Sequence, residues 1–290
     1  MNTVFYFIIY QLSRLPLSVL YWFADFLYFL LYTVIGYRRN VIKNNLRNCF
    51  PEKSEKEIDQ IYKDFYRYFT DYLVETLKAF SITQEELDQR HTFSNMEAFA
   101  EIKAEGRNAM MMNGHVFNWE WYINLGKYMP IENTCAVYHK VKNPFWNEKI
   151  NHIRERFGTI TIDMKDVLRF MMKAPNDGSH VFLFVADQSP KKSAVHFWTK
   201  FFNQDTPAFN GFEKIAIRKN IGVVYCKTEK IKRGYYHTTF ERMYPADGVQ
   251  FKENEIVEQF FSKLENHIKE DPANWLWSHK RWKYKKEDFQ

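Results

Sequence analysis

From residue 107 onward, short apolar segments alternate with segments of helical periodicity. The expected strands are residues 109–113, 134–140, 159–162 and 180–186, and the helices between them are residues 119–128, 144–157 and 164–173. Such alternation is typical of a parallel sheet, because each crossover helix returns the chain to the same sheet edge. We therefore predict an α/β fold with a mostly parallel mixed sheet flanked by helices.

Three regions are expected along the chain. Residues 101–290 would form the single α/β domain, which also holds helices at 211–219 and 253–269 and strands at 221–228 and 235–243. Residues 37–100 would form a helical, membrane-proximal region. Within it, residues 54–80 place apolar side chains every three or four positions, and Ser54 with Glu57 predicts a capping box. Residues 1–36 would form a hydrophobic membrane helix.

Composition limits the class of protein. Hydrophobic residues make up 46% of the 290 residues, which excludes a disordered or low-complexity chain. The net charge of +6 suits an anionic partner, such as phosphate, a membrane surface or an acidic protein. Cys49, Cys135 and Cys226 are odd in number and widely spaced, so neither a disulfide framework nor a zinc pair is expected. Motifs for nucleotide-dependent or zincin chemistry are also missing from the sequence.

The segment 15–35 is almost entirely apolar and is long enough, at ~1.5 Å per residue, to cross a bilayer core of about 30 Å. Asp25 opposes spanning, and the many aromatic residues also suit a helix lying in the interface or a buried helix. No signal-peptide pattern is present, so the segment should persist. The basic residues that follow it, at positions 38, 39, 43 and 47, predict that the bulk of the chain is cytoplasmic.

One candidate catalytic pair lies in the segment 110–123, where an apolar strand runs into Asn113 and Gly114. His115 then follows the carboxyl end of a strand, where open α/β sheets place ligand sites. On one straight helix His115 and Glu120 would be about 140° apart. If His115 lies in the turn instead, Glu120 can reach an imidazole nitrogen and raise the basicity of the other. The alternatives are a turn histidine with a surface carboxylate, or a metal site. For the metal site, the residue spacing indicates no third ligand.

Further polar residues lie near other strand and helix ends. Asp187 and Gln188 end the strand 180–186, so Asp187 is expected at the same sheet edge as His115, either in the site or as a turn former. Arg154 and Arg156 end a helix, where arginines contact substrate, cap carbonyls or face solvent.

The segment 274–284 interleaves tryptophans with basic residues that include His279 and Arg281. This pattern suits a membrane interface or a nucleic-acid strand, and the apolar N-terminus favours the membrane. Alternatively, the tryptophans pack on the core and the charges are solvated.

Together these motifs resemble the lysophospholipid acyltransferase superfamily, and within it the lauroyl and myristoyl transferases of lipid A biosynthesis. The superfamily hallmark is a histidine, four residues and an acid, and GHVFNWE supplies His115 and Glu120. The resemblance continues through VYHKVKNP, the arginines before Gly158, ADQSP, FFNQDTPAFNG and WLWSHKRWK. An EGTR-like phosphate motif is missing, which disfavours lysophosphatidic acid as the acceptor.

The resemblance implies transfer of a fatty acyl group from acyl carrier protein or coenzyme A to a lipid A precursor hydroxyl, with no metal or cofactor. His115 would be the general base and Glu120 would orient it. The implied substrate contacts are Arg154, Arg156, Asp187, Gln188, Gly211, His279 and Arg281. For the oxyanion of the reaction, the candidate donors are backbone N–H groups at the Gly114 turn or an arginine such as Arg156. The expected location is the cytoplasmic side of the inner membrane, with no nucleic-acid partner. The alternatives are another lyso- or amino-acid lipid as acceptor, a membrane-tethered lipid-binding protein, or a metal-dependent hydrolase.

Overall fold

The computed structural model describes residues 2–245 and 251–289. The helices are α1 (Asn2–Ser13), α2 (Leu17–Tyr28), α3 (Arg39–Cys49), α4 (Glu55–Lys78), α5 (Gln84–Arg90), α6 (Glu97–Ala104), α7 (Leu125–Tyr128), α8 (Pro144–Glu155), α9 (Met164–Lys173), α10 (Gly211–Lys219) and α11 (Glu255–Glu270). The strands are β1 (His91–Ser94), β2 (Ala109–Asn113), β3 (Asn133–Tyr138), β4 (Thr159–Asp163), β5 (His180–Val185), β6 (Phe197–Phe201), β7 (Gln204–Ala208), β8 (Gly222–Lys232) and β9 (Tyr235–Tyr244). A π-helix (Phe29–Ile35) continues α2, and a 3₁₀ helix (Trp119–Asn124) precedes α7.

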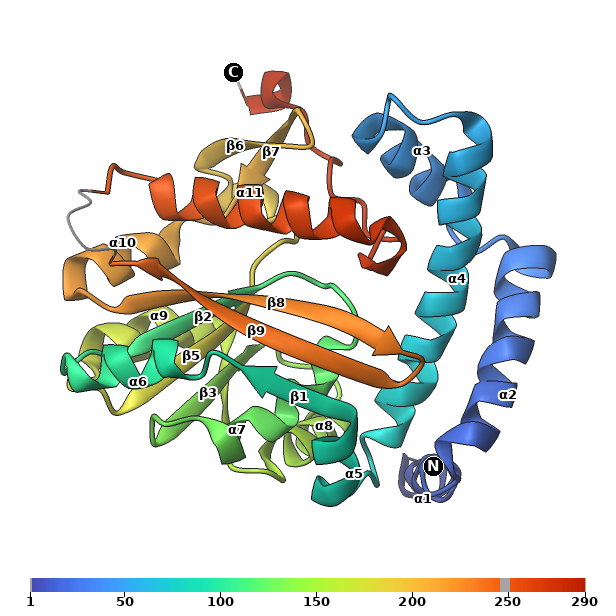
Figure 1. Ribbon diagram of the computed structural model, residues 1–290, viewed down its shortest axis with the longest axis horizontal. Coiled ribbons are helices and arrows are strands. Elements are labelled where there is room, and N and C mark those ends of the chain that lie inside the picture. The colour runs from blue at the N-terminus through green and yellow to red at the C-terminus, as the bar shows by residue number, and fades with distance from the viewer. Residues whose placement is uncertain (1, 246–250, 290) are drawn as a thin grey trace.

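Seven strands form one sheet in the order β1-β9-β8-β2-β5-β3-β4 (Figure 1). All neighbours are parallel except β8 and β9, which form an antiparallel hairpin. The predicted α/β fold with a mostly parallel mixed sheet is therefore confirmed. The carboxyl ends of β2, β5 and β3 meet at one edge, which is where such sheets place their ligand sites.

Helices cover both faces of the sheet. Met110 and Met112 of β2 pack into the core that contains α9, α10 and α11, whereas Ala109 and Met111 face the core beneath α6 and α7. β2 is buried on both sides, which is why its sequence is a continuous apolar run and does not alternate with polar residues.

The predicted long helix of the N-terminal region is α4. Ser54 accepts a hydrogen bond from the Glu57 backbone N–H, and the Glu57 carboxylate accepts from the Ser54 backbone, so the expected capping box is present. α4 runs beside the end of the sheet where the β8–β9 hairpin turns (Figure 1).

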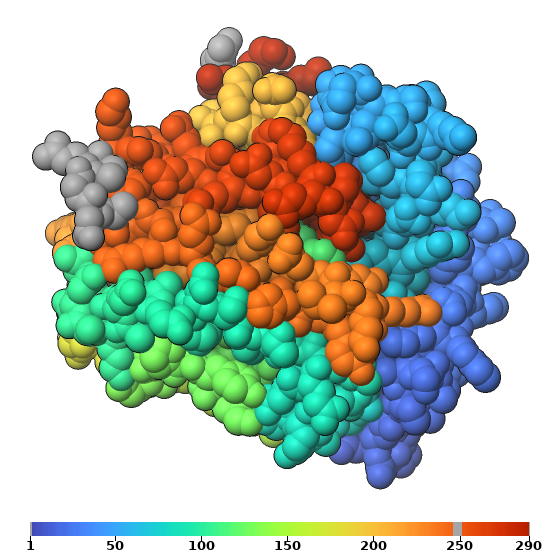
Figure 2. Space-filling model, in the orientation of Figure 1, coloured from blue at the N-terminus to red at the C-terminus, as the bar shows by residue number. Residues whose placement is uncertain are grey.

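The N-terminal helices lie on the outside of the domain. Leu17, Leu20 and Ala24 of α2 are buried in the main core, and α2 packs along α4. The opposite face of α2 exposes Trp22 and Phe26. In Figure 2 these helices, in blue, form the outer edge of the molecule and meet the orange tip of the β8–β9 hairpin. Within the described residues, one helical segment, Leu17–Ile35, is long and apolar enough to cross a membrane, and 11% of an 18-residue stretch within it is buried.

Some features differ from the sequence expectations. Strand β1 comes from the region expected to be helical and pairs with β9, and β6 and β7 form a separate antiparallel hairpin. The expected helix over residues 119–128 divides into the 3₁₀ helix and α7. Asp25, expected to be an isolated charge in an apolar helix, forms an ion pair with Arg233 at 2.7 Å.

Candidate active site

His115 lies in the loop that follows the central strand β2, as expected from the sequence. Gly114 separates it from the strand end at Asn113. A Cβ atom on Gly114 would lie 2.6 Å from Leu264 Cδ1 and 3.3 Å from Asp187 Oδ2. Glycine therefore lets the loop approach both α11 and the carboxylate that follows β5.

Asp187 is the carboxylate that holds His115. Its Oδ1 lies 2.5 Å from His115 Nδ1, and its Oδ2 accepts the backbone N–H of His115 at 2.9 Å. A third donor, Trp275 Nε1, reaches Oδ2 at 2.6 Å. Because an ionised carboxylate only accepts hydrogen bonds, the ring proton of neutral His115 belongs on Nδ1.

The environment of Asp187 favours its ionised form. Burial by itself would raise the pKa of this carboxyl group, but the charge of His115 and the hydrogen bonds from His115 and Trp275 lower it to about 2. The side chain is 1% exposed, whereas that of His115 is 16% exposed. The pair therefore has a buried anion at one end and an accessible imidazole at the other.

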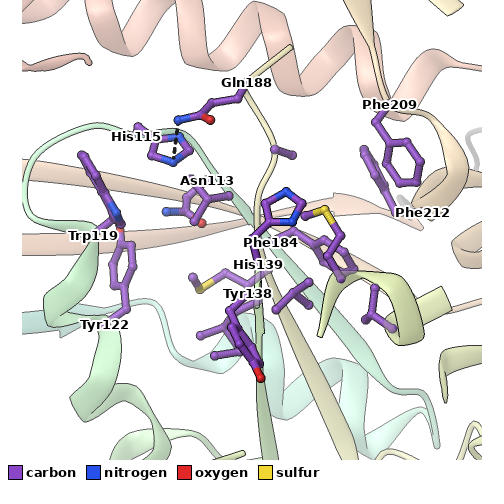
Figure 3. Close-up of a pocket in the computed structure, with 18 of the residues that line it drawn as sticks. Asn113, His115, Trp119, Tyr122, Tyr138, His139, Phe184, Gln188, Phe209 and Phe212 are labelled. Carbon is purple, nitrogen blue, oxygen red and sulfur yellow. Dashed lines mark hydrogen bonds between the residues drawn. The ribbon is translucent and has the colours of Figure 1, made fainter. Parts of the chain in front are cut away.

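The second ring nitrogen, Nε2, is the unprotonated nitrogen that can act as a base, and it lies on the side of the ring next to the pocket. Gln188 Nε2 lies 3.1 Å from it and donates to its lone pair in this tautomer (Figure 3). The Trp119 ring stands edge-on to the imidazole, with centroids 4.7 Å apart.

A pocket of about 650 Å³ opens beside His115, between the carboxyl ends of β2, β3 and β5 and the helices α8, α9 and α10. Most of its lining is apolar, including Met111, Tyr138, Leu168, Phe184, Phe209 and Phe212. Figure 3 shows Phe209 and Phe212 on the side opposite Trp119 and Tyr122. Such a volume and lining suit a ligand with a long apolar part. Arg154, Lys165 and Lys191 also contribute to the lining and add positive charge.

The expected contact between His115 and Glu120 is not formed. Glu120 instead accepts two hydrogen bonds from Arg154 Nη2, at 3.1 and 3.2 Å. Phe117 takes a positive φ of 54°, and the 3₁₀ helix begins at Trp119, so the chain turns before Glu120 and directs it toward α8. Both residues still line the pocket.

Of the predicted arginines, only Arg154 lies at the pocket. Arg156 donates to the carbonyls of Ala79 and Ile82 beyond the end of α4, which is the capping alternative. Its guanidinium group is therefore engaged by these carbonyls, and Arg156 does not line the described pocket. The reason is that α8 ends at Glu155 and the chain then turns away.

The C-terminal residues predicted to contact lipid are enclosed by the fold. Arg281 is fully buried and donates to the Pro207 carbonyl and to Ser189 Oγ. His279 Nε2 accepts the Ser189 backbone N–H at 3.3 Å, and burial lowers the pKa of this imidazole to about 4. Trp275 and Trp277 are also buried, as the alternative of a tail packed on the core expected, but Arg281 is buried with them and is not solvated.

Gly211 begins α10 between two pocket residues but is not itself part of the described lining. A Cβ there would lie 2.7 Å from Phe209 Cζ, so the glycine leaves space for that ring.

Sequence reasoning placed Asp187 at the correct edge but preferred Glu120 as the partner of His115. It assigned no role to Trp119 or to the Trp275 N–H group. The signal for Asp187 was available, because neighbouring parallel strands bring their carboxyl ends together.

Among residues 2–245 and 251–289, no cluster of three or more His, Cys, Asp or Glu side chains is arranged to hold a metal ion.

Comparison with known proteins assigns the chain to a family. The family model for bacterial lipid A biosynthesis acyltransferases matches residues 3–284. Lipid A biosynthesis acyltransferase 2 of Shigella flexneri is 21% identical over 239 residues, which cover 80% of this chain and 74% of that protein. The matched region contains the pocket, His115 and Asp187. The chain is an acyltransferase that belongs to the bacterial lipid A biosynthesis acyltransferase family.

Proposed function

We propose that this protein moves a fatty acyl chain from the thioester of acyl carrier protein to a hydroxyl group of a lipid A precursor. The observation that supports this most directly is the His115–Asp187 pair at the side of a large apolar pocket. A base next to an apolar pocket suits acyl transfer, because the acyl chain can be bound while the hydroxyl group is activated.

In this reaction His115 Nε2 replaces its contact with Gln188 by one with the acceptor hydroxyl and takes its proton. The hydroxyl oxygen forms a bond to the thioester carbon, the carbon–sulfur bond breaks, and the leaving thiolate receives the proton from His115. Asp187 stabilises the imidazolium that forms in between. No step uses a metal or a cofactor. Arg154, held by Glu120, is available to bind an anionic group of either substrate.

The apolar lining is proposed to bind the acyl chain, at ~0.8 kcal/mol for each CH₂ group removed from water. The net positive charge suits an acidic carrier protein and also suits phosphorylated lipids. Coenzyme A is the alternative donor, and another lyso- or amino-acid lipid is the alternative acceptor.

We further propose that the protein works at the cytoplasmic face of the inner membrane, with α1 and α2 lying in the lipid interface. α2 has one face packed on α4, and its Asp25 is paired with Arg233 of the domain, so a helix surrounded by lipid on all sides would lose both contacts. The exposed side, with Trp22 and Phe26, suits the interfacial region of a bilayer.

The test combines a lipid A precursor with acyl carrier protein or coenzyme A thioesters and follows the products by mass spectrometry. We expect acyl transfer that survives a metal chelator and falls at least ~100-fold in a folded His115→Ala variant. Wild-type turnover in that variant would contradict the base assignment. Lipid binding without any transfer would favour the membrane-tethered binding protein, and loss of activity with chelator would favour the hydrolase.

A further inference from the structure

A buried carboxylate lies behind the His115 loop, outside the pocket. Glu75 of α4 is 0% exposed, and three side chains from three other elements donate to it. Tyr21 OH of α2 reaches Oε1 at 2.8 Å, Tyr236 OH of β9 reaches Oε2 at 2.7 Å, and Asn118 Nδ2 reaches Oε2 at 3.0 Å. A buried carboxylate is costly unless such donors satisfy it, so the network favours one arrangement of these elements.

Asn118 connects this carboxylate to the active site. It lies three positions after His115 and is the residue that precedes the 3₁₀ helix holding Trp119 and Glu120. Trp121 in the same helix donates its Nε1–H to the backbone carbonyl of Glu75 at 3.1 Å. Glu75 therefore holds the downstream end of the loop through both its side chain and its main chain.

The C-terminal segment holds the opposite side of the same loop. The Leu276 N–H donates to the His115 carbonyl at 3.1 Å, and the Phe117 N–H donates to the Asn274 carbonyl at 3.0 Å. Phe117 itself has the positive φ of 54°, a backbone conformation that a bulky side chain adopts only when its surroundings impose it. The loop thus depends on contacts from both directions, and Glu75 supplies those on one side.

We propose that Glu75 is a positioning residue for His115, and that Tyr21 completes its hydrogen bonds, so that the seating of α2 on the domain helps to set the catalytic loop. Neither residue lines the described pocket, so they act through Asn118 and the 3₁₀ helix. The proposal rests on the proposed function for the catalytic role of His115. The contacts by which Glu75 holds the loop do not depend on that function.

The central experiment is Tyr21→Phe in the full chain, because it removes only the hydroxyl that reaches Glu75. We expect kcat per folded molecule to fall about three- to tenfold, the scale of one net hydrogen bond, while KM for donor and acceptor changes less than about twofold. Tyr28→Phe is the matched control, since Tyr28 lies two turns further along α2 and its hydroxyl does not contact Glu75. It should keep wild-type kcat. Glu75→Gln keeps the shape of the side chain but replaces one carboxyl oxygen with an NH₂ group that cannot accept hydrogen bonds, and should lower kcat further.

A purely structural role predicts a different result. In that case Tyr21→Phe and Glu75→Gln would lower the melting temperature but leave kcat per folded molecule unchanged, which would overturn the proposal. A rise in KM with constant kcat would also overturn it.

A second readout does not depend on acyl transfer. The ring ¹⁵N signals of His115 report its tautomer and its hydrogen bonds. We expect them to shift or broaden in Tyr21→Phe and Glu75→Gln but to match wild type in Tyr28→Phe. If the wild type transfers no acyl group, these signals still test the positioning role, so the two proposals can fail separately. Unchanged His115 signals in both variants would contradict the positioning of the loop by Glu75.

Discussion

At the scale of single residues, two carboxylates are candidates for the partner of His115, and the structure assigns them different partners. Asp187 contacts the imidazole, and Glu120 contacts Arg154. We expect Asp187→Asn to lower kcat by about 10²- to 10⁴-fold, because the amide no longer fixes the proton on Nδ1 or stabilises the imidazolium.

Glu120→Gln is the comparison for that variant, measured in the same acyl-transfer assay. Because it weakens the hold on Arg154, it should chiefly raise the KM of the anionic substrate. A larger loss of kcat in Glu120→Gln than in Asp187→Asn would contradict the assignment of Asp187 as the carboxylate that assists His115.

The buried carboxyl group of Glu75 should make stability depend on pH. Burial raises the pKa of Glu75 from 4.5 to about 7. The nearby charge of Asp71 adds to this rise, whereas the hydrogen bonds from Tyr236 and Tyr21 oppose it. The folded state therefore keeps this proton when the unfolded chain has lost it. Its contribution to stability is complete below about pH 4 and is lost as the pH rises through about 7.

Thermal unfolding of wild type and Glu75→Gln at several pH values checks this expectation. The melting temperature of the wild type, relative to that of the variant, should fall between about pH 4.5 and pH 7.5. A difference that stays constant over that interval would mean that Glu75 is ionised throughout.

At the scale of elements, the exposed face of α2 is the proposed contact with lipid. Trp22 is 78% exposed and Phe26 is 61% exposed. Replacing either residue with Ser should weaken sedimentation with vesicles of anionic phospholipid by about tenfold, because a buried aromatic side chain is worth about 1.5 to 3 kcal/mol. The melting temperature should not change, since neither ring lies in the core.

Ile217→Ser on α10 is the matched control, because Ile217 is also an exposed apolar residue but lies away from the N-terminal helices. It should leave vesicle binding unchanged. Alkaline carbonate treatment of membranes adds a second check, since it should release an interfacial protein. Retention in the membrane after that treatment would favour a spanning helix over the interfacial one proposed here.

At the scale of the whole molecule, the C-terminal segment ties distant parts of the chain together. Arg281 joins it to the loop after β5 through Ser189 and to β7 through the Pro207 carbonyl. The guanidinium group of Arg281 also lies over the ring of Phe261, which belongs to α11. We expect Arg281→Met to lower the free energy of unfolding by about 2 to 4 kcal/mol, because two buried acceptors lose their donor.

Chemical unfolding in detergent measures this effect, with the exposed Lys280→Met as the control. The KM for the acceptor should be the same in wild type and in the folded Arg281→Met protein, because the guanidinium group is enclosed by the core. A raised acceptor KM without loss of stability would instead mean that Arg281 reaches the lipid in another conformation.

Local patterns in the sequence determined most of the fold. The apolar runs predicted β2, β3, β4 and β5, the three- and four-residue spacing predicted α4, and the position of His115 after β2 followed from the strand and the Asn-Gly turn. These predictions succeeded because periodicity and turn chemistry act over a few neighbouring residues. The resemblance to acyltransferases also followed from short motifs, and the family match agrees with it.

The partners of each polar side chain were decided only by the tertiary structure. His115 is five positions from Glu120 but 72 from Asp187, and the parallel pairing of β2 with β5 brings the distant carboxylate closer. Likewise, Arg281 looks like a surface charge in its own segment, yet β7 and α11 enclose it. Sequence patterns specify which face of an element is apolar, whereas hydrogen-bond partners depend on how the sheet orders its strands and on which chain ends pack across them.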